Sequence, residues 1–177
     1  ELGIKQKLLS QKEVLELEPN LNPVFDAGII FEHAMHARDP HGILKLIFKL
    51  FLKRGGKFIQ TNIKSVEQSK NDETILRSEK EEYKFEKSVV ASGAFSKQFT
   101  DQLGEKIPLD TERGYHVHFK GQEKLISRPV IFLDRGFGMT PMNQGLRAVG
   151  TVELGGIKNP LSKKRIEYVT RCAKELL

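Results

Sequence analysis

The sequence predicts an α+β fold built on a large mixed, mainly antiparallel sheet with flanking helices. Two observations lead to this class: apolar residues recur at helical spacing in residues 40–54, and short strand-like segments follow one another in residues 113–154. A third observation extends it. Residues 88–91 form a short, mainly apolar strand that runs directly into Ser92-Gly93-Ala94; this is either an ordinary strand-to-helix turn or, as in open α/β sheets, a place where a ligand approaches the backbone.

The first predicted helix begins at a capping box. Ser10 and Glu13 stand three residues apart, so the hydroxyl and the carboxylate can each satisfy a backbone N–H group at the start of a helix. Pro19 ends this helix, because proline has no N–H to continue the hydrogen-bond ladder. A turn at Asn22-Pro23 then precedes a short apolar strand over residues 27–31.

The second predicted helix carries the clearest signal in the chain. Asp39 is its N-cap, Pro40 takes the first helical position, and Gly55-Gly56 ends it. Its apolar residues recur at helical spacing and predict a buried face, namely Leu44, Ile47, Phe48 and Phe51. Three lysines form a solvated stripe, namely Lys45, Lys49 and Lys53.

The remaining elements follow from alternation and from turn residues. Strands are predicted over residues 57–66, 74–76, 83–85, 88–91, 113–120, 130–134, 138–142 and 146–154. Helices are predicted over residues 95–103 and from Ser162 onward. In the strand over residues 113–120 the side chains alternate, so that Tyr115, Val117 and Phe119 point to one face and His116 and His118 to the other.

The composition is that of a globular chain. Hydrophobic residues make up 38% and charged residues 29% of the 177 residues, which excludes an intrinsically disordered chain, and no apolar run is long enough to span a bilayer. The single cysteine, Cys172, excludes an internal disulfide. The net charge of +6 is concentrated near the end of the chain, and we interpret this basic run as a solvated helix face, because no aromatic ladder accompanies it.

No complete catalytic set can be assembled from the residues. Five histidines invite a metal interpretation, but no carboxylate or cysteine cluster completes a site, so we predict no metal; they are His33, His36, His41, His116 and His118. Arg113 and Arg147 are the arginines best placed for a carboxylate clamp, with a surface ion pair as the alternative for each. The phosphate-binding pattern G-x-G-x-x-G does not occur.

Four segments, taken in order, resemble the D-amino-acid oxidase superfamily of flavoproteins, with the nearest likeness to its bacterial D-amino-acid dehydrogenases and glycine oxidases. They are similar to the family patterns L-S-x-x-E…E-P, a D-P helix start, V-V-x-A-x-G-A (with Ser88 at the first Val), and T-P…L-R-x-x-G-T-x-E. The segments are residues 9–13 with 18–19, 38–42 with 55–66, 88–95 with 108–109 and 113–115, and 139–142 with 146–153. The likeness covers nearly the whole chain.

The resemblance implies a flavoenzyme that moves a hydride from the α-carbon of an amino acid, in the first place a D-amino acid, to FAD, giving a 2-oxo acid and ammonia. It places a first set of residues near the adenosine and pyrophosphate of FAD, namely Val66, Ala91, Ser92 and Gly93. It places a second set toward the isoalloxazine ring and the substrate, namely Gly138, Met139, Thr140 and Glu153.

The resemblance also divides the chain. Residues 1–56, with their helices, lead into a substrate domain. Residues 57–107 are part of the FAD-binding α/β domain and contain a three-stranded excursion, a strand and a helix. Residues 108–177 form the substrate-domain sheet and the terminal helix. The family's dinucleotide-binding unit and the G-x-R-P arginine that binds the substrate carboxylate lie outside this sequence, and Phe95 stands where the family has Trp. We therefore expect this chain alone to bind FAD weakly or not at all, and to be inactive.

Two other functions stay open. One is a related flavoenzyme that acts on sarcosine-like amines or 2-hydroxy acids, and the other is a non-catalytic module whose basic helix binds an acidic partner. The expected partner is a small amino-acid substrate and not a nucleic acid. We expect a cytoplasmic location, and the charge of +6 is compatible with peripheral association at the inner face of the cell membrane or with a respiratory chain.

Overall fold

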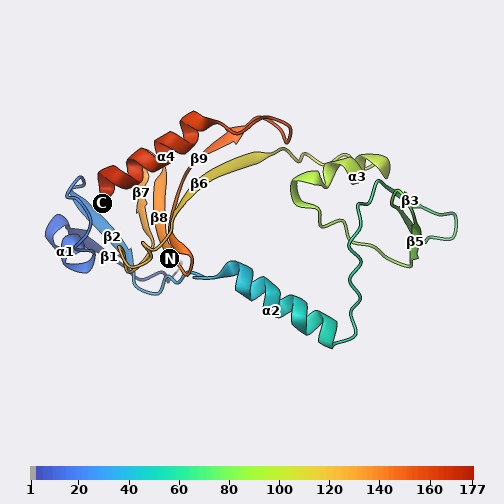
Figure 1. The fold of residues 1–177 in the computed structure, drawn as a ribbon, viewed down its shortest axis with the longest axis horizontal. Helices are drawn as coiled ribbons and strands as arrows, with labels where there is room; N and C mark the ends of the chain where they lie inside the picture. Colours follow the sequence, from blue (N-terminus) through green and yellow to red (C-terminus); the bar gives the residue numbers. More distant parts are fainter. Residues whose placement is uncertain (1–2) are drawn as a thin grey trace. The chain divides into compact units, whose positions relative to one another are not determined.

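The computed structural model describes residues 3–177 and confirms the α+β class, with helices and antiparallel strand pairs (Figure 1). The elements in chain order are β1 (Gln6–Ser10), α1 (Gln11–Leu17), β2 (Ala27–Phe31), α2 (Pro40–Lys53), β3 (Ser65–Gln68), β4 (Thr74–Arg77), β5 (Glu82–Phe85), the 3-10 helix η1 (Gly93–Phe95), α3 (Lys97–Gln102), β6 (Glu112–Phe119), β7 (Val130–Phe132), the 3-10 helix η2 (Leu133–Arg135), β8 (Phe137–Met142), β9 (Gly145–Leu154) and α4 (Lys163–Leu176). The capping box of Ser10 and Glu13 is confirmed at the start of α1.

The strands form three sheets rather than the single large sheet that the sequence predicted. β1 pairs with β2, β3-β4-β5 form a second sheet, and β6-β9-β8-β7 form the third. β1 was not predicted, because its residues alternate only weakly; its pairing with β2, with Leu8 opposite Ile29, makes it a strand. The predicted strand over residues 130–134 ends early, at Phe132, because η2 follows and Gly136 turns the chain with a φ of 54°.

The main core lies against one face of the four-stranded sheet. Alternate residues of β8 and β9 point into this core, among them Met139, Leu146 and Ala148, which are at most 1% exposed. The helix α4 packs against the same face with its apolar side (Figure 1). The core cluster consists of Leu21, Tyr115, Ile126, Phe137, Met139, Leu146, Ala148, Val169, Cys172, Ala173 and Leu176.

The predicted limits of α2 are confirmed, but the predicted burial of its apolar face is not. Asp39 Oδ1 accepts a hydrogen bond from the Gly42 N–H at 2.9 Å, and Gly55 takes the left-handed conformation that ends the helix, with a φ of 88°. No residue of α2 is buried, and Leu44 and Ile47 are 62% and 59% exposed. The limits of the helix are set by capping residues next to it in the sequence, whereas burial requires a second element to cover the helix.

Two predicted strands are wrong. Of residues 57–66 only Ser65 and Val66 belong to a strand, and residues 88–91 form none. Each segment contains apolar residues, yet Ile59 and Val89 are 54% and 89% exposed. A strand needs a neighbour to accept its hydrogen bonds, and within residues 3–177 no strand pairs with residues 57–64 or 88–91. The strand-like sequence pattern was therefore not sufficient to make either segment a strand.

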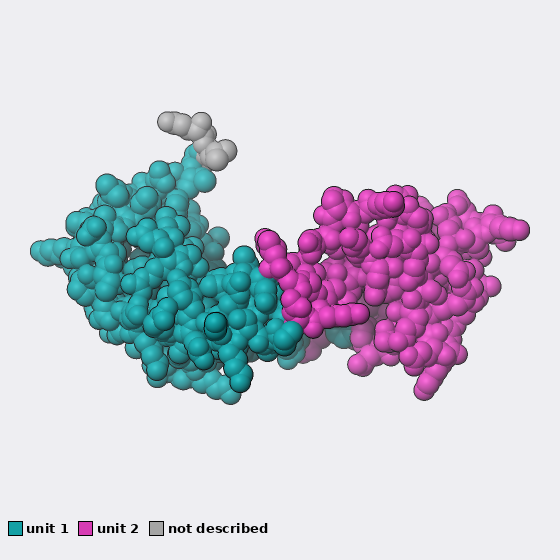
Figure 2. Space-filling view, turned by 90° about the horizontal axis from the view of Figure 1, so that it is seen from above, with its two compact units in different colours: residues 1–48, 113–153, 160–177 teal, residues 49–112, 154–159 magenta. Residues whose placement is uncertain are grey.

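The chain divides into two compact units, coloured separately in Figure 2. Unit 1 contains residues 1–48, 113–153 and 160–177, and unit 2 contains residues 49–112 and 154–159. The four-stranded sheet and α4 belong to unit 1, and the three-stranded sheet and α3 belong to unit 2. Within residues 3–177, every helix is too short or too polar to cross a bilayer.

Candidate functional site

The face of the four-stranded sheet opposite the core cluster carries basic side chains. On β6, His116 and His118 alternate with residues that pack in or against the core, and on β9 Arg147 lies between two core residues. Thr140 of β8 lies opposite Arg147 in the strand register. Because β9 lies between β6 and β8, the fold gathers these residues on three neighbouring strands. We call Arg147, His116 and His118 the basic cluster.

The basic cluster has hydrogen-bonding capacity that the chain does not use. The His116 and His118 rings meet edge to face, with 5.2 Å between their centroids and 83° between their planes. Partial burial lowers the pKa of His116, and the nearby Arg147 and His118 lower it further. Within residues 3–177, Nδ1 of His118 and Nε of Arg147 are buried without a hydrogen-bond partner. Such atoms favour an acceptor supplied from outside the chain.

Sequence reasoning singled out Arg147 and the two histidines separately, as a clamp candidate and as a candidate metal pair, but it did not join them. The strand alternation of β6 and β9 was visible in the sequence; the pairing of β6 with β9 was not. Within residues 3–177 no group of three metal-ligating side chains is found. His36 instead lies with its Nε2 atom 3.2 Å from the Pro141 carbonyl oxygen.

The predicted substrate-pocket residues of β8 divide between the two faces of the sheet. Gly138 and Thr140 alternate with the core residues, so they lie on the face of the basic cluster. Met139 points into the core and is 1% exposed as a whole residue, and β8 pairs on both sides of it, with Val130 and with Ala148, so it presents no open surface to a ligand. A Cβ atom at Gly138 would lie 3.3 Å from the Val130 carbonyl oxygen, so a side chain would be tightly placed there.

Glu153, the fourth predicted pocket residue, contacts β6. Its carboxylate accepts a hydrogen bond from the Tyr115 hydroxyl at 2.5 Å and lies 3.6 Å from Nη1 of Arg113. The Tyr115 oxygen in turn accepts a hydrogen bond from the Ser162 N–H at 3.0 Å. Thr151 has a φ of 62°, which interrupts the alternation of β9 two residues earlier. Glu153 is thus directed to a side chain of the core cluster.

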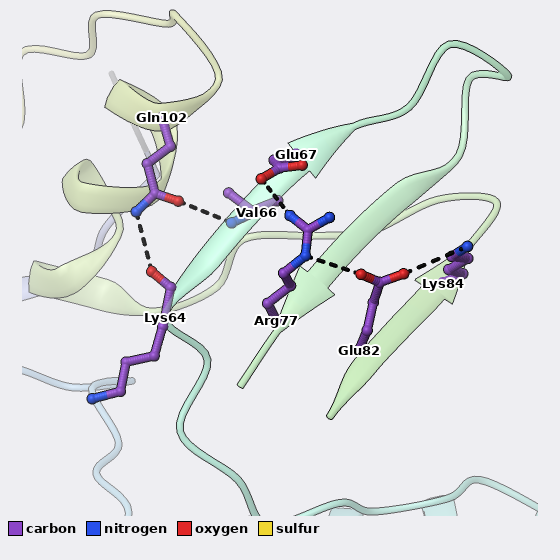
Figure 3. A network of polar contacts seen from close by, with 7 residues as sticks. All are labelled: Lys64, Val66, Glu67, Arg77, Glu82, Lys84 and Gln102. Atoms are coloured by element: carbon purple, nitrogen blue, oxygen red, sulfur yellow. Dashed lines mark hydrogen bonds and ion pairs between the residues drawn. The ribbon is translucent and has the colours of Figure 1, made fainter. Parts of the chain in front are cut away.

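In unit 2, the predicted cofactor residue Val66 is fixed by α3. Its N–H donates to Oε1 of Gln102 at 2.9 Å, and Nε2 of Gln102 donates to the Lys64 carbonyl oxygen at 3.3 Å (Figure 3). The Val66 side chain is 2% exposed. In the neighbouring strands Arg77 pairs with both Glu67 and Glu82. Nothing near Gln102 in the sequence indicated that it would tie β3 to α3.

The other predicted cofactor residues, Ala91, Ser92 and Gly93, are exposed at the start of η1. Gly93 has a φ of 54°, and a Cβ atom there would meet nothing within 4 Å. The turn is closed by a hydrogen bond of 3.0 Å from the Phe95 N–H to the Ser92 carbonyl oxygen. Small exposed residues leave this backbone open to a bulky ligand. A groove of about 510 Å³ adjoins the turn in unit 2, lined by Ala94, Phe95 and residues of α3, 109–111 and 155–158.

Comparisons with known proteins agree on one family. The family model described as DAO, FAD dependent oxidoreductase, matches residues 1–177. The D-amino-acid oxidase of Bradyrhizobium diazoefficiens is 32% identical over 168 residues, which are 95% of this chain and 40% of that protein. The D-amino acid dehydrogenase of Vibrio atlanticus is 25% identical over 192 aligned positions, covering 99% of this chain and 43% of that protein.

The solved structures agree at the level of the fold. The crystal structure of glycine oxidase from Geobacillus kaustophilus superposes with a TM-score of 0.80 at 17% identity, covering 99% of this chain and 47% of that one. The chain therefore spans less than half the length of these similar proteins.

Proposed function

The chain belongs to the family of FAD dependent oxidoreductases, which matches it over residues 1–177, and on this premise we propose that it is part of an enzyme that oxidatively deaminates D-amino acids. The observation that supports this substrate class is the 32% identity to a D-amino-acid oxidase over 95% of the chain. Bound FAD would supply the chemistry, by accepting a hydride from the α-carbon. The resulting imino acid hydrolyses to a 2-oxo acid and ammonia.

For the cofactor, we propose that unit 2 contributes to the adenosine and pyrophosphate side. Ala91, Ser92 and Gly93 fit this role, because they are small and exposed and because Gly93 leaves open space above the backbone. Val66 would support the adenosine from β3, with its N–H group already held by Gln102. None of these four residues carries a charge that could pair with the phosphates of FAD. The proposal therefore includes a further phosphate-binding element.

For the substrate, we propose that unit 1 contributes the wall that faces the isoalloxazine ring. Gly138 leaves that wall flat, Thr140 offers a hydroxyl group, and Met139 would support the wall from the core side. Glu153, whose carboxylate is held by the Tyr115 hydroxyl at 2.5 Å, would stand at the margin of this wall. The role of these residues is to orient the substrate against the flavin and to exclude water from it.

The experiment that tests the proposal uses the full-length gene product. We expect the purified protein to carry a visible flavin absorption band, and the band to bleach when a D-amino acid is added without oxygen. One equivalent each of 2-oxo acid and ammonia should form per flavin reduced. Buffer without substrate and the matching L-amino acid are the controls. Bleaching by sarcosine or a 2-hydroxy acid, with none by D-amino acids, would replace the proposal with the related flavoenzyme.

The alternative of a non-catalytic basic helix has less support. Val169 and Leu176 of α4 are buried in the core cluster, so one side of this helix is already occupied. On its other side, Arg171 and Arg135 both pair with Glu175. The cytoplasmic location, peripheral membrane association and the choice between oxygen and a respiratory carrier as electron acceptor stay proposals, which cell fractionation and acceptor assays test.

A further inference from the structure

We propose that the basic cluster on the open face of the sheet binds the side-chain carboxylate of an acidic amino-acid substrate, so that amino-dicarboxylic acids are the preferred substrate class. This inference rests on the proposed function, since it takes the wall around Thr140 as the substrate wall. It goes beyond that function by naming the substrate and the residues of β6 and β9 that select it.

The first support is the position of the cluster. Arg147 lies directly opposite Thr140 in the register of β8 and β9, and residues opposite each other in neighbouring strands have adjacent side chains on one face. His116 and His118 lie on β6, the next strand beyond β9. A substrate that touches Thr140 therefore reaches Arg147 first.

The second support is the unused hydrogen-bonding capacity. Nε of Arg147 and Nδ1 of His118 are buried and have no partner within residues 3–177. A buried donor without an acceptor is costly, so an acceptor from outside the chain is favoured at this place. The guanidinium fork of arginine matches the two oxygens of a carboxylate, because it presents parallel N–H groups.

The third support is the balance of charge. The groups that act on His116 are Arg147 and His118, and no carboxylate of residues 3–177 is among them. The charged groups next to His116 are thus basic, a setting that favours an anionic ligand.

The decisive experiment compares two substrates in the flavin-loaded full-length protein. We expect Arg147→Gln to lower kcat/KM for D-glutamate by about tenfold to a hundredfold, the range for one lost charge-assisted hydrogen bond, and to leave D-alanine within about threefold. Arg147→Lys should recover part of the loss, since it keeps the charge without the fork. Arg171→Gln removes the same charge from the exposed side of α4 and should change neither substrate.

Two kinetic outcomes would overturn the inference. Equal losses for D-glutamate and D-alanine would assign Arg147 to the α-carboxylate or to the fold. An unchanged preference for D-glutamate would remove Arg147 from the site.

A binding measurement separates this inference from the proposed function. In the same protein, the two-carboxylate probe glutarate should raise the pKa of His116, followed by NMR, whereas butyrate and inorganic phosphate should raise it less. Arg147→Gln should abolish the glutarate effect. If no amino acid is oxidised but glutarate still binds, the proposed function fails and the binding site stands; if glutarate has no effect on His116, the site fails.

Discussion

Among single residues, Tyr115 connects parts of unit 1 that are far apart in the sequence. Its hydroxyl donates to Glu153 and accepts from the Ser162 N–H, while its ring is 4% exposed in the core cluster. The residue therefore joins β6, the end of β9 and the start of α4. Through this contact it also positions Glu153, which we propose lies at the margin of the substrate wall.

Removal of the Tyr115 hydroxyl should cost stability without emptying the core. We expect Tyr115→Phe to lower the free energy of unfolding by about 1–2 kcal/mol, because the half-buried Glu153 carboxylate and the Ser162 N–H each lose a partner. Urea unfolding measures this loss. Tyr83→Phe is the matched control: its hydroxyl donates to the carboxylate of Glu81 at the surface, and its loss should cost less than about 0.5 kcal/mol. Equal losses of unfolding free energy for the two variants would contradict the stabilising role of the Tyr115 hydroxyl.

Among the elements, α1 depends on an ionised cap. The pKa of Glu13 is lowered from its ordinary value of 4.5 to about 2, first by the hydrogen bond from the Ser10 N–H and then by Lys7 and the Ser10 hydroxyl. A carboxyl group whose pKa is lower in the folded chain stabilises the fold above pH 4.5, and this stabilisation is lost as the pH falls toward 2. The start of α1 should therefore stay capped at pH 4.

The chemical shift of the Ser10 amide reports this cap directly. We expect it to titrate with a midpoint near 2, the lowered pKa of Glu13, and Glu13→Gln to remove the titration. Glu16→Gln, in the same helix but away from Ser10, is the control and should leave the midpoint unchanged. A midpoint near 4.5, the ordinary value for this group, would show that the capping box does not hold the carboxylate in solution.

The exposed face of α2 gives a second prediction at the scale of elements. Leu44 and Ile47 are 62% and 59% exposed, so Leu44→Lys combined with Ile47→Lys should change the unfolding free energy of residues 1–177 by less than about 0.5 kcal/mol. In the full-length protein the same pair should cost about 1.5–3 kcal/mol per side chain if a further segment covers this face. Thermal unfolding of both chain lengths compares the two. Equal small effects would show that α2 stays uncovered.

For the whole molecule, we expect flavin retention to differ between residues 1–177 and the longer enzyme of which we propose they are part. We expect residues 1–177 to lose FAD on desalting and the full-length protein to keep it, because the residues proposed for the pyrophosphate offer backbone but no charge, and because the chain spans 40% of a similar D-amino-acid oxidase. The visible absorption spectrum after desalting measures this. A retained flavin band in residues 1–177 would show that the described residues already complete the site.

Local features were decided by the sequence itself. The cap of α1 by Ser10 and Glu13, and the limits of α2 at Pro40 and Gly55, depend on residues within one or two helical turns, and they are found where predicted. The alternation along β6 is equally local, so it correctly separated Tyr115 from the two histidines. The family motifs were readable for the same reason, since each is a short run of residues.

Features that depend on a partner far away in the sequence, such as strand pairing and burial, were decided only by the tertiary structure. Residues 57–64 and 88–91 contain residues that favour strands, yet no strand within residues 3–177 pairs with them, and a strand forms only beside a neighbour that takes its hydrogen bonds. Glu18 is 4% exposed because the Ser127 N–H donates to it at 2.8 Å, a contact across more than a hundred residues. The basic cluster likewise exists only because β6 pairs with β9. Hydrogen bonds along a helix or a cap are fixed by spacing, whereas sheet pairing and burial are fixed by which surfaces meet.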